Sequence, residues 1–223
     1  MCGRFVLHHE IDSLCENLSV EQSRFEIGPR YNIAPTQLVA VVLAGKEGQG
    51  RALDAHKWGL IPFWSKDPKI GSRMINARAE TVAEKPAFRA ALRYRRCLIP
   101  TSGYYEWQKT DEGKIPHYLH MADNRPFAMA GLWEEWTSPD EEIVRSCAII
   151  TTEANAFAAQ IHHRMPVILD ENGQAAWFDY SLKNPAHITA PLVPYAKDDM
   201  AAHPVSTRVN TATFEDPCCI EPA

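Results

Sequence analysis

The chain has 223 residues, of which 45% are hydrophobic and 23% are charged, and its formal net charge is −5 at pH 7. The length suits a single domain, the composition excludes disordered and fibrous proteins, and the overall negative charge argues against a strongly basic nucleic-acid binder. Because no apolar run approaches the roughly 18 residues of a membrane-spanning helix, and MCGRFVLHHE lacks the pattern of a secretory signal, we expect a cytoplasmic protein without a membrane segment.

The first half of the chain is predicted to hold two helices and a β-hairpin. Apolar residues recur at helical spacing over residues 9–18, which predicts an amphipathic helix. The β-branched run at 38–44 predicts a strand, and the glycines at 45, 48 and 50 predict the turn of a hairpin. Pro86 is typical of a first helical position, so a second helix is expected from there to about residue 96.

The second half is predicted to be mostly β-sheet. Apolar and aromatic segments separated by turn residues predict strands within 97–109, 116–121, 126–133 and 146–152. Short helices are expected at 152–160 and 172–180, and the Pro-rich stretch 185–204 is expected to be a loop or linker. This order of elements predicts an α+β fold with a mainly antiparallel, barrel-like β-sheet core flanked by short helices.

The domain organisation follows from the absence of any boundary signal. We expect a single domain over residues 1–223, with a core that ends near residue 210 and a C-terminal tail over 211–223.

Positive charge is concentrated in one part of the chain. Residues 57–100 hold ten Lys or Arg against three Asp or Glu, a local net charge of +7, which leaves −12 for the rest. Aromatic side chains are interleaved with these cations, as a single-stranded nucleic-acid groove requires, because cations follow phosphates and rings stack on bases. A solvated helix face beside ordinary core aromatics explains the same pattern, and on the residues alone both interpretations stay open.

The six cysteines show neither a disulfide framework nor a metal-binding pattern, so we expect no metal and no cofactor. Cys2 differs from the others because it directly follows Met1. If Met1 is removed, Cys2 carries a free α-amine and a thiol, whose ordinary pKa values are about 7.7–8.0 and about 8.5. Such an aminothiol attacks an aldehyde through nitrogen and then closes a thiazolidine ring through sulfur. The alternative is that a small residue stands at position 2 by accident.

Seven short motifs lie in order along the chain from residue 1 to about residue 206: MCGRF, RYNIAPTQ, WGLIPFW, INARAET, GYYEW, IHHRMP and HPVS. Together they closely resemble the SRAP (SOS response-associated peptidase) family, whose members crosslink to abasic sites in single-stranded DNA. The resemblance implies an abasic site processing protein that shields such sites through a thiazolidine DNA–protein crosslink at Cys2. It also implies two side activities, an autopeptidase reaction that removes Met1 and an abasic-site lyase reaction by β-elimination.

The resemblance also implies roles for four residues in the reaction. Cys2 matches the crosslinking cysteine, and Asn76 of INAR matches the Asn that orients it. Glu106 of GYYEW matches the catalytic Glu, which would shuttle protons during imine formation and ring closure. His162 of IHHRMP matches the His that would protonate the sugar ring oxygen, and only the motif alignment selects it over His163.

A second set of residues is implied to contact DNA. Arg4, Arg78 and Arg164 have guanidinium groups that suit phosphate, and Pro35 and Trp64 match apolar surfaces that lie against bases. The chain departs from the family where members often carry a bulkier or basic pair, because it has Pro86 and Ala87 there. This departure removes the basis for expecting a wedge residue at a junction of single-stranded and duplex DNA.

Two other function classes remain open from the sequence. Glutamine amidotransferases of the N-terminal-nucleophile type also begin Met-Cys-Gly, so a Cys2 amidohydrolase or glutaminase is the main alternative. A non-catalytic DNA-binding module is the third hypothesis, and it predicts reversible, salt-sensitive binding. The expected partner is single-stranded DNA with abasic sites, the expected state is a monomer, and the expected place is the cytoplasm, at the nucleoid in a bacterium.

Overall fold

Five strands form a closed barrel in the computed structural model, which describes residues 2–25, 28–45 and 50–223. The barrel strands are β4 (Leu38–Leu43), β5 (Arg51–Trp58), β7 (Arg96–Thr101), β10 (Phe127–Thr137) and β11 (Ile143–Glu153). They pair antiparallel in the order β5–β4–β7–β10–β11. A parallel pairing of β11 with β5, in which Cys147 lies opposite Trp58, closes the ring. The expected α+β fold with a mainly antiparallel, barrel-like core is therefore confirmed.

Four short strands extend the barrel. They are β2 (Val20–Ser23), which pairs with β5; β6 (Asn76–Arg78) and β12 (Arg164–Pro166), which pair with β11; and β13 (Ile168–Leu169), which pairs with β10.

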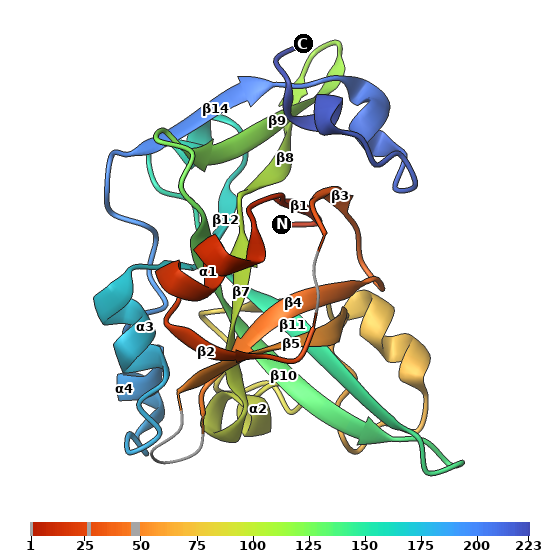
Figure 1. Cartoon of the computed structure of the whole chain (residues 1–223), viewed down its shortest axis with the longest axis vertical. Coiled ribbons are helices and arrows are strands. Elements are labelled where there is room, and N and C mark those ends of the chain that lie inside the picture. The colour runs from red at the N-terminus through yellow and green to blue at the C-terminus, as the bar shows by residue number, and fades with distance from the viewer. Residues whose placement is uncertain (1, 26–27, 46–49) are drawn as a thin grey trace.

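A second sheet lies beside the barrel, in the order β14–β9–β8–β1–β3. Its strands are β1 (Arg4–Leu7), β3 (Arg30–Ile33), β8 (Gly103–Thr110), β9 (Gly113–Met121) and β14 (Met200–Pro204). In Figure 1, β1 and β3 lie between the upper strands β8, β9 and β14 and the barrel strands below. A Cβ at Gly103 would lie 2.4 Å from the Tyr118 ring, so only glycine fits at this position where β8 pairs with β9.

Because side chains alternate along its strands, the second sheet separates two apolar cores, one on each of its faces. Phe5 of β1 and Tyr104 of β8 belong to the large core with Cys2 and the barrel residues. Val6 and Tyr105 point to the other face, into a small core that also contains Cys219.

The helices are short and lie around the sheets. The α-helices are α1 (Ile11–Asn17), α2 (Arg89–Tyr94), α3 (Glu171–Trp177) and α4 (Pro185–Thr189). The 3-10 helices are η1 (Pro68–Arg73), η2 (Ala158–Gln160), η3 (Thr207–Asn210) and η4 (Pro217–Ile220).

The last segment of the chain returns to the first strands. Residues 207–220, which we call the C-terminal strap, contain η3 and η4 and pack onto β1, β3 and β9 near the carboxyl end of the chain (Figure 1). The strap therefore includes part of 211–223, the residues that the sequence assigns to a tail.

Several sequence-based predictions of elements are confirmed. The hairpin is β4–β5, although its Gly48 lies outside the described residues. The helix at 9–18 is α1, and that at 172–180 is α3, which Asp170 caps by accepting from the Gly173 N–H. The four segments predicted as strands coincide with β7 and β8, β9, β10 and β11.

Three other predictions are wrong in part. Pro86 does not begin a helix, because it lies in a turn closed by the Phe88 N–H and the Lys85 carbonyl, and α2 begins only at Arg89. Only residues 158–160 of the helix expected at 152–160 are helical, because β11 continues to Glu153. The segment 185–204 is not just a loop or linker, since it contains α4 and the strand β14.

Candidate active site

Cys2 lies two residues before β1, and its side chain is fully buried. The Asn76 Nδ2 group donates a hydrogen bond of 2.8 Å to the Cys2 backbone carbonyl. Asn76 is in place because β6 pairs with β11, with Asn76 opposite Ile149. Burial raises the pKa of the Cys2 thiol, and the charge of Glu106 raises it further, so the thiol keeps its proton at neutral pH.

Glu106 and His162 are two titratable side chains that lie close to each other. Glu106 lies on β8 and only 3% of its surface is exposed, so burial raises the pKa of its carboxyl group. His162 precedes β12, and its Nδ1 lies 3.9 Å from Glu106 Oε1. The backbone of Arg164 lies against this same Nδ1, with its N–H group at 3.1 Å and its carbonyl oxygen at 3.2 Å. Burial lowers the pKa of His162, so the ring is neutral near pH 7.

The structure brings together segments that lie far apart in the sequence. Asn76 contacts residue 2, Glu106 faces residue 162, and the charge of Glu106 acts on the Cys2 thiol. A buried cysteine, a carboxyl group with a raised pKa and an imidazole with a lowered pKa can together carry out nucleophilic addition with proton transfer.

A hollow of about 370 Å³ opens beside Asn76. It is lined by Trp64, Met74, Asn76, Arg78, Thr81, Lys85, Pro86, Ala87 and Phe88. Trp64 is 51% exposed, and the Arg78 and Lys85 side chains are exposed, so a ring and two cations face solvent around an apolar floor. The quoted motifs contain Trp64, Arg78 and Thr81, of which only Trp64 and Arg78 were expected to contact DNA, whereas Met74 lies outside the motifs and carries no signal that could have selected it.

The other predicted DNA contacts lie outside this hollow. Pro35 lies half-buried in the turn between β3 and β4. Arg164 forms an ion pair with Glu80, with Nη1 at 2.6 Å from Oε1 and Nη2 at 3.0 Å from Oε2. Arg4 donates from Nη1 to Asn32 Oδ1 at 2.8 Å and also binds the C-terminal strap. Contact of these residues with DNA stays a prediction.

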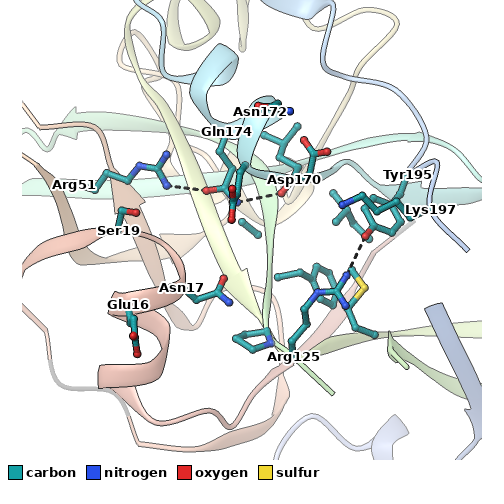
Figure 2. Close-up of a pocket in the computed structure, with 17 residues that line it drawn as sticks. Glu16, Asn17, Ser19, Arg51, Arg125, Asp170, Asn172, Gln174, Tyr195 and Lys197 are labelled. Carbon is teal, nitrogen blue, oxygen red and sulfur yellow. Dashed lines mark hydrogen bonds between the residues drawn. The ribbon is translucent and has the colours of Figure 1, made fainter. Parts of the chain in front are cut away.

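A larger hollow, of about 670 Å³, lies between α1, the start of β10 and the start of α3 (Figure 2). Two of its cations are bound within the protein: Arg51 donates to Gln174 Oε1 at 2.7 Å (Figure 2), and Arg125 donates to Asp199 Oδ2 at 2.5 Å. None of the predicted site residues lines it, so this hollow lies apart from the candidate site.

Within the described ranges, no group of three or more His, Cys, Asp or Glu side chains is placed to hold a metal ion. Among the helices of the part of the chain that the structure describes, none is long and apolar enough to cross a membrane.

Comparison with known proteins finds relatives over nearly the whole chain. Residues 1–212 match the sequence profile of the family described as "SOS response associated peptidase (SRAP)". The chain is 42% identical to the abasic site processing protein YoqW of Bacillus subtilis (strain 168), over 99% of each protein. It is 32% identical to the abasic site processing protein HMCES of Gallus gallus, over 87% of this chain and 66% of that protein. A crystal structure of a protein from Bacteroides thetaiotaomicron superposes with a TM-score of 0.89 at 26% identity, over the full length of both chains.

Proposed function

Because the chain belongs to the SOS response associated peptidase (SRAP) family, we propose that it binds single-stranded DNA at an abasic site and joins the exposed sugar covalently through Cys2. The observation that carries the proposal is the position of Asn76. This side chain holds the Cys2 backbone at 2.8 Å and also lines the hollow that contains Trp64 and Arg78. The nucleophile and a surface suited to nucleic acid therefore share one residue.

The reaction begins with a free α-amine on Cys2, which requires hydrolysis of the Met1–Cys2 bond. The abasic sugar opens to an aldehyde when one proton moves from its C1′ hydroxyl to its ring oxygen. We assign this transfer to Glu106 and His162, because a carboxyl group with a raised pKa and an imidazole with a lowered pKa can exchange a proton near neutral pH. The Cys2 nitrogen then adds to the aldehyde carbon and forms a carbinolamine.

Water leaves and sulfur takes its place in the next two steps. The protonated Glu106 carboxyl gives its proton to the carbinolamine hydroxyl, which departs as water and leaves an iminium ion. The Glu106 carboxylate then takes the proton of the Cys2 thiol, and sulfur bonds to the iminium carbon. One amine, one thiol and one aldehyde give one thiazolidine and one water, and Glu106 ends as it began. The raised pKa of the thiol fits a group that releases its proton only to this base.

Access to the sugar sets the preference for single strands. A duplex hides the C1′ carbon, whereas a single strand can place bases on Trp64 and phosphates on Arg78 and Lys85, which face the hollow. Pro86 and Ala87 line the same hollow without a bulky side chain, so we infer that the strand is held by the groove and not by a wedge in a duplex. β-Elimination from the iminium ion and self-removal of Met1 are the two side activities that fit this chemistry. One lesion needs one Cys2, so we propose that the active form is a monomer.

A denaturing gel tests the proposal. Wild-type protein, Cys2→Ala and a variant with one extra residue before Cys2 are incubated with an oligonucleotide that carries one abasic site, and with a matched oligonucleotide that carries a tetrahydrofuran analogue without an aldehyde. We expect a heat-stable shifted band only for wild type and only with the aldehyde. Glu106→Gln should slow its formation by about 100-fold or more, because the proton transfer is lost.

The same gel separates the competing functions. If protein that mass spectrometry shows to begin at Cys2 gives no shifted band, the crosslinking proposal is wrong. Glutamine hydrolysis by that protein would then favour the amidohydrolase, and salt-sensitive binding without a covalent species would favour a passive DNA-binding module.

A further inference from the structure

Arg4 connects the strand that follows Cys2 to the far end of the chain. Its Nη1 donates to the carbonyl of Val209 at 2.5 Å, and its Nη2 donates to the carbonyl of Asn210 at 3.3 Å. The same Nη1 donates to Asn32 Oδ1 at 2.8 Å. The guanidinium group therefore binds the C-terminal strap (residues 207–220) through two backbone carbonyls, and partial burial lowers its pKa.

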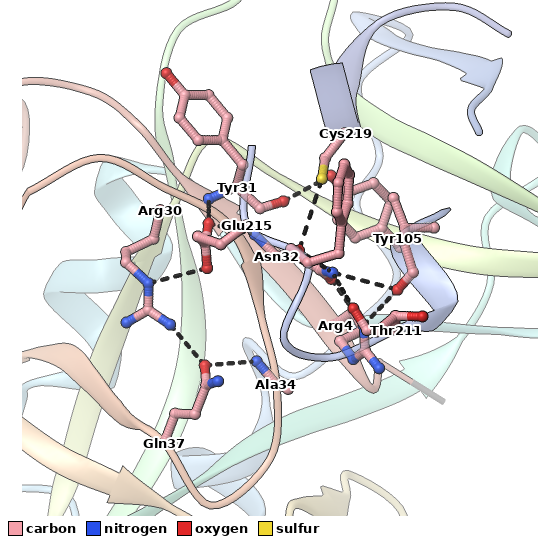
Figure 3. Close-up of polar contacts among 12 residues, drawn as sticks. Arg4, Arg30, Tyr31, Asn32, Ala34, Gln37, Tyr105, Thr211, Glu215 and Cys219 are labelled. Carbon is pink, nitrogen blue, oxygen red and sulfur yellow. Dashed lines mark hydrogen bonds and ion pairs between the residues drawn. The ribbon is translucent and has the colours of Figure 1, made fainter. Parts of the chain in front are cut away.

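Asn32 and Glu215 fasten the strap to β3, the neighbour of β1 (Figure 3). Asn32 is fully buried, and its Nδ2 donates to the carbonyls of Thr211 at 3.1 Å and Phe214 at 2.8 Å. Glu215 Oε1 accepts from the N–H groups of residues 31 and 32. Because a buried amide and a carboxylate both bind backbone groups, the strap has one defined position over the first strands.

The strap also contacts the strand that carries Glu106. The Trp107 Nε1–H group donates to Asn210 Oδ1 at 2.8 Å. Trp107 is the neighbour of Glu106 on β8, and its side chain points to the opposite face of the sheet. Asn210 thus binds both strands, β1 through its backbone oxygen and Arg4, and β8 through its side-chain oxygen and Trp107.

We propose that the strap positions Cys2 against Glu106, and that Asn210 is the positioning residue that couples β1 to β8. The inference rests on the proposed function, since it concerns the geometry of that reaction. Arg4 and Trp107 are positioning residues in the same sense, because they act through the strands and do not touch the reacting atoms. A displacement of about 1 Å between reacting groups can slow a reaction by about 100-fold, so a link between these two strands can control the rate.

A positioning role for Arg4 differs in a measurable way from a contact of Arg4 with a DNA phosphate. A phosphate contact affects the DNA concentration that gives half-maximal crosslinking, and its loss reduces the salt dependence of binding. A positioning residue affects the first-order crosslinking rate at saturating DNA and leaves that concentration unchanged.

The test uses the full chain and two conservative changes. Asn210→Ala removes the acceptor and Trp107→Phe removes the donor, and we expect each to lower the rate at saturating abasic DNA about tenfold. The double variant should be no slower than either single variant, because both remove one interaction. Asn210→Asp keeps Oδ1 and should restore most of the rate. Asp170→Ala, which removes the cap of α3, is the control for a general loss of stability and should crosslink at the wild-type rate.

A second readout does not depend on DNA. Alkylation of Cys2 by iodoacetamide, followed by peptide mass spectrometry, should be faster in Asn210→Ala and Trp107→Phe and unchanged in Asp170→Ala, because loosening β1 exposes the buried thiol. Wild-type rates of crosslinking and of Cys2 alkylation in both Asn210→Ala and Trp107→Phe would overturn the inference. If wild type itself forms no crosslink, the proposed function fails, and the alkylation rates alone decide whether the strap holds Cys2.

Discussion

Acidification is expected to destabilise the fold through His56, a histidine of β5 whose side chain is fully buried. Neither of its ring nitrogens has a hydrogen-bond partner among the described residues. Asp54 Oδ2 lies 3.7 Å from Nε2, and Arg145 Nη1 lies 3.7 Å from the same oxygen. Burial is the largest effect and lowers the pKa of His56 from 6.5 to about 4, although Asp54 acts in the opposite direction.

The pKa of His56 is 6.5 in the unfolded chain and about 4 in the folded chain, and this difference sets the sign and size of the change in stability. Above pH 6.5 the ring is neutral in both the folded and the unfolded chain and has no effect on stability. Below pH 6.5 the unfolded chain binds a proton that the folded chain does not, so the free energy of unfolding falls as the pH drops toward 4. A difference of about 2.5 between the pKa values corresponds to about 3 kcal/mol, which is a large part of the stability of a typical domain.

Urea unfolding at pH 7.5, 6.5, 5.5 and 4.5 measures this loss. Wild type is compared with His56→Phe and His56→Gln, neither of which titrates at this position. We expect both variants to lose less stability than wild type between pH 6.5 and 4.5, by about 2 kcal/mol, whatever their stability at pH 7.5. Other titrating groups, such as Glu106 and His162, are common to all three proteins and cancel in the comparison. Parallel pH profiles for the three proteins would refute the reasoning.

Three further predictions concern single side chains. Tyr104→Phe should raise the free energy of unfolding by about 1 kcal/mol, because the hydroxyl of Tyr104 is buried without a hydrogen-bond partner in the described part of the chain; a decrease in urea denaturation would contradict this. Gly59→Ala should lower the free energy of unfolding by about 1–3 kcal/mol, because Gly59 has φ of +130° and a Cβ there would lie 2.6 Å from the Gly71 carbonyl oxygen. An unchanged thermal midpoint would contradict this. Arg78→Gln should weaken binding to single-stranded oligonucleotides of any sequence and reduce the slope of log affinity against log salt by about 0.7, whereas an unchanged slope in fluorescence anisotropy would show that Arg78 meets no phosphate.

The sequence predicted the barrel better than the sheet that holds the nucleophile. The strands β4, β7, β10 and β11 are long apolar segments with clear turn residues, so their pattern is visible in isolation. In contrast, β1, β3 and β14 have only four or five residues each, and they become strands because β8 pairs with β1, β1 with β3 and β9 with β14. Pairing between distant segments decides such short strands, and no local pattern records it.

In the candidate site, too, the sequence identified residues that lie in local motifs but not the contacts between distant segments. The motifs selected Asn76, Glu106 and His162, and in the structure Asn76 contacts residue 2 while Glu106 lies 3.9 Å from His162; their roles in the reaction stay predictions. The link through Asn210 could not be predicted, because it joins backbone and side-chain oxygens to groups more than 100 residues away. The ion pair of Arg164 with Glu80 was also not visible, since a motif identifies a residue type and not its partner in the fold.

The strap has a consequence for the order in which the molecule is made. Arg4 binds a carbonyl 205 residues further along the chain, so the ribosome makes Cys2 at the start of synthesis and the strap residues that hold β1 near its end. At about 5–20 residues per second, the interval is about ten seconds or more. During the first half of synthesis β1 lacks its partner strand β8. Until nearly the end it also lacks the carbonyls of residues 209 and 210. A nascent chain therefore carries Cys2 before it has the strap, and we expect fast crosslinking to abasic DNA to be acquired only after the full chain has left the ribosome.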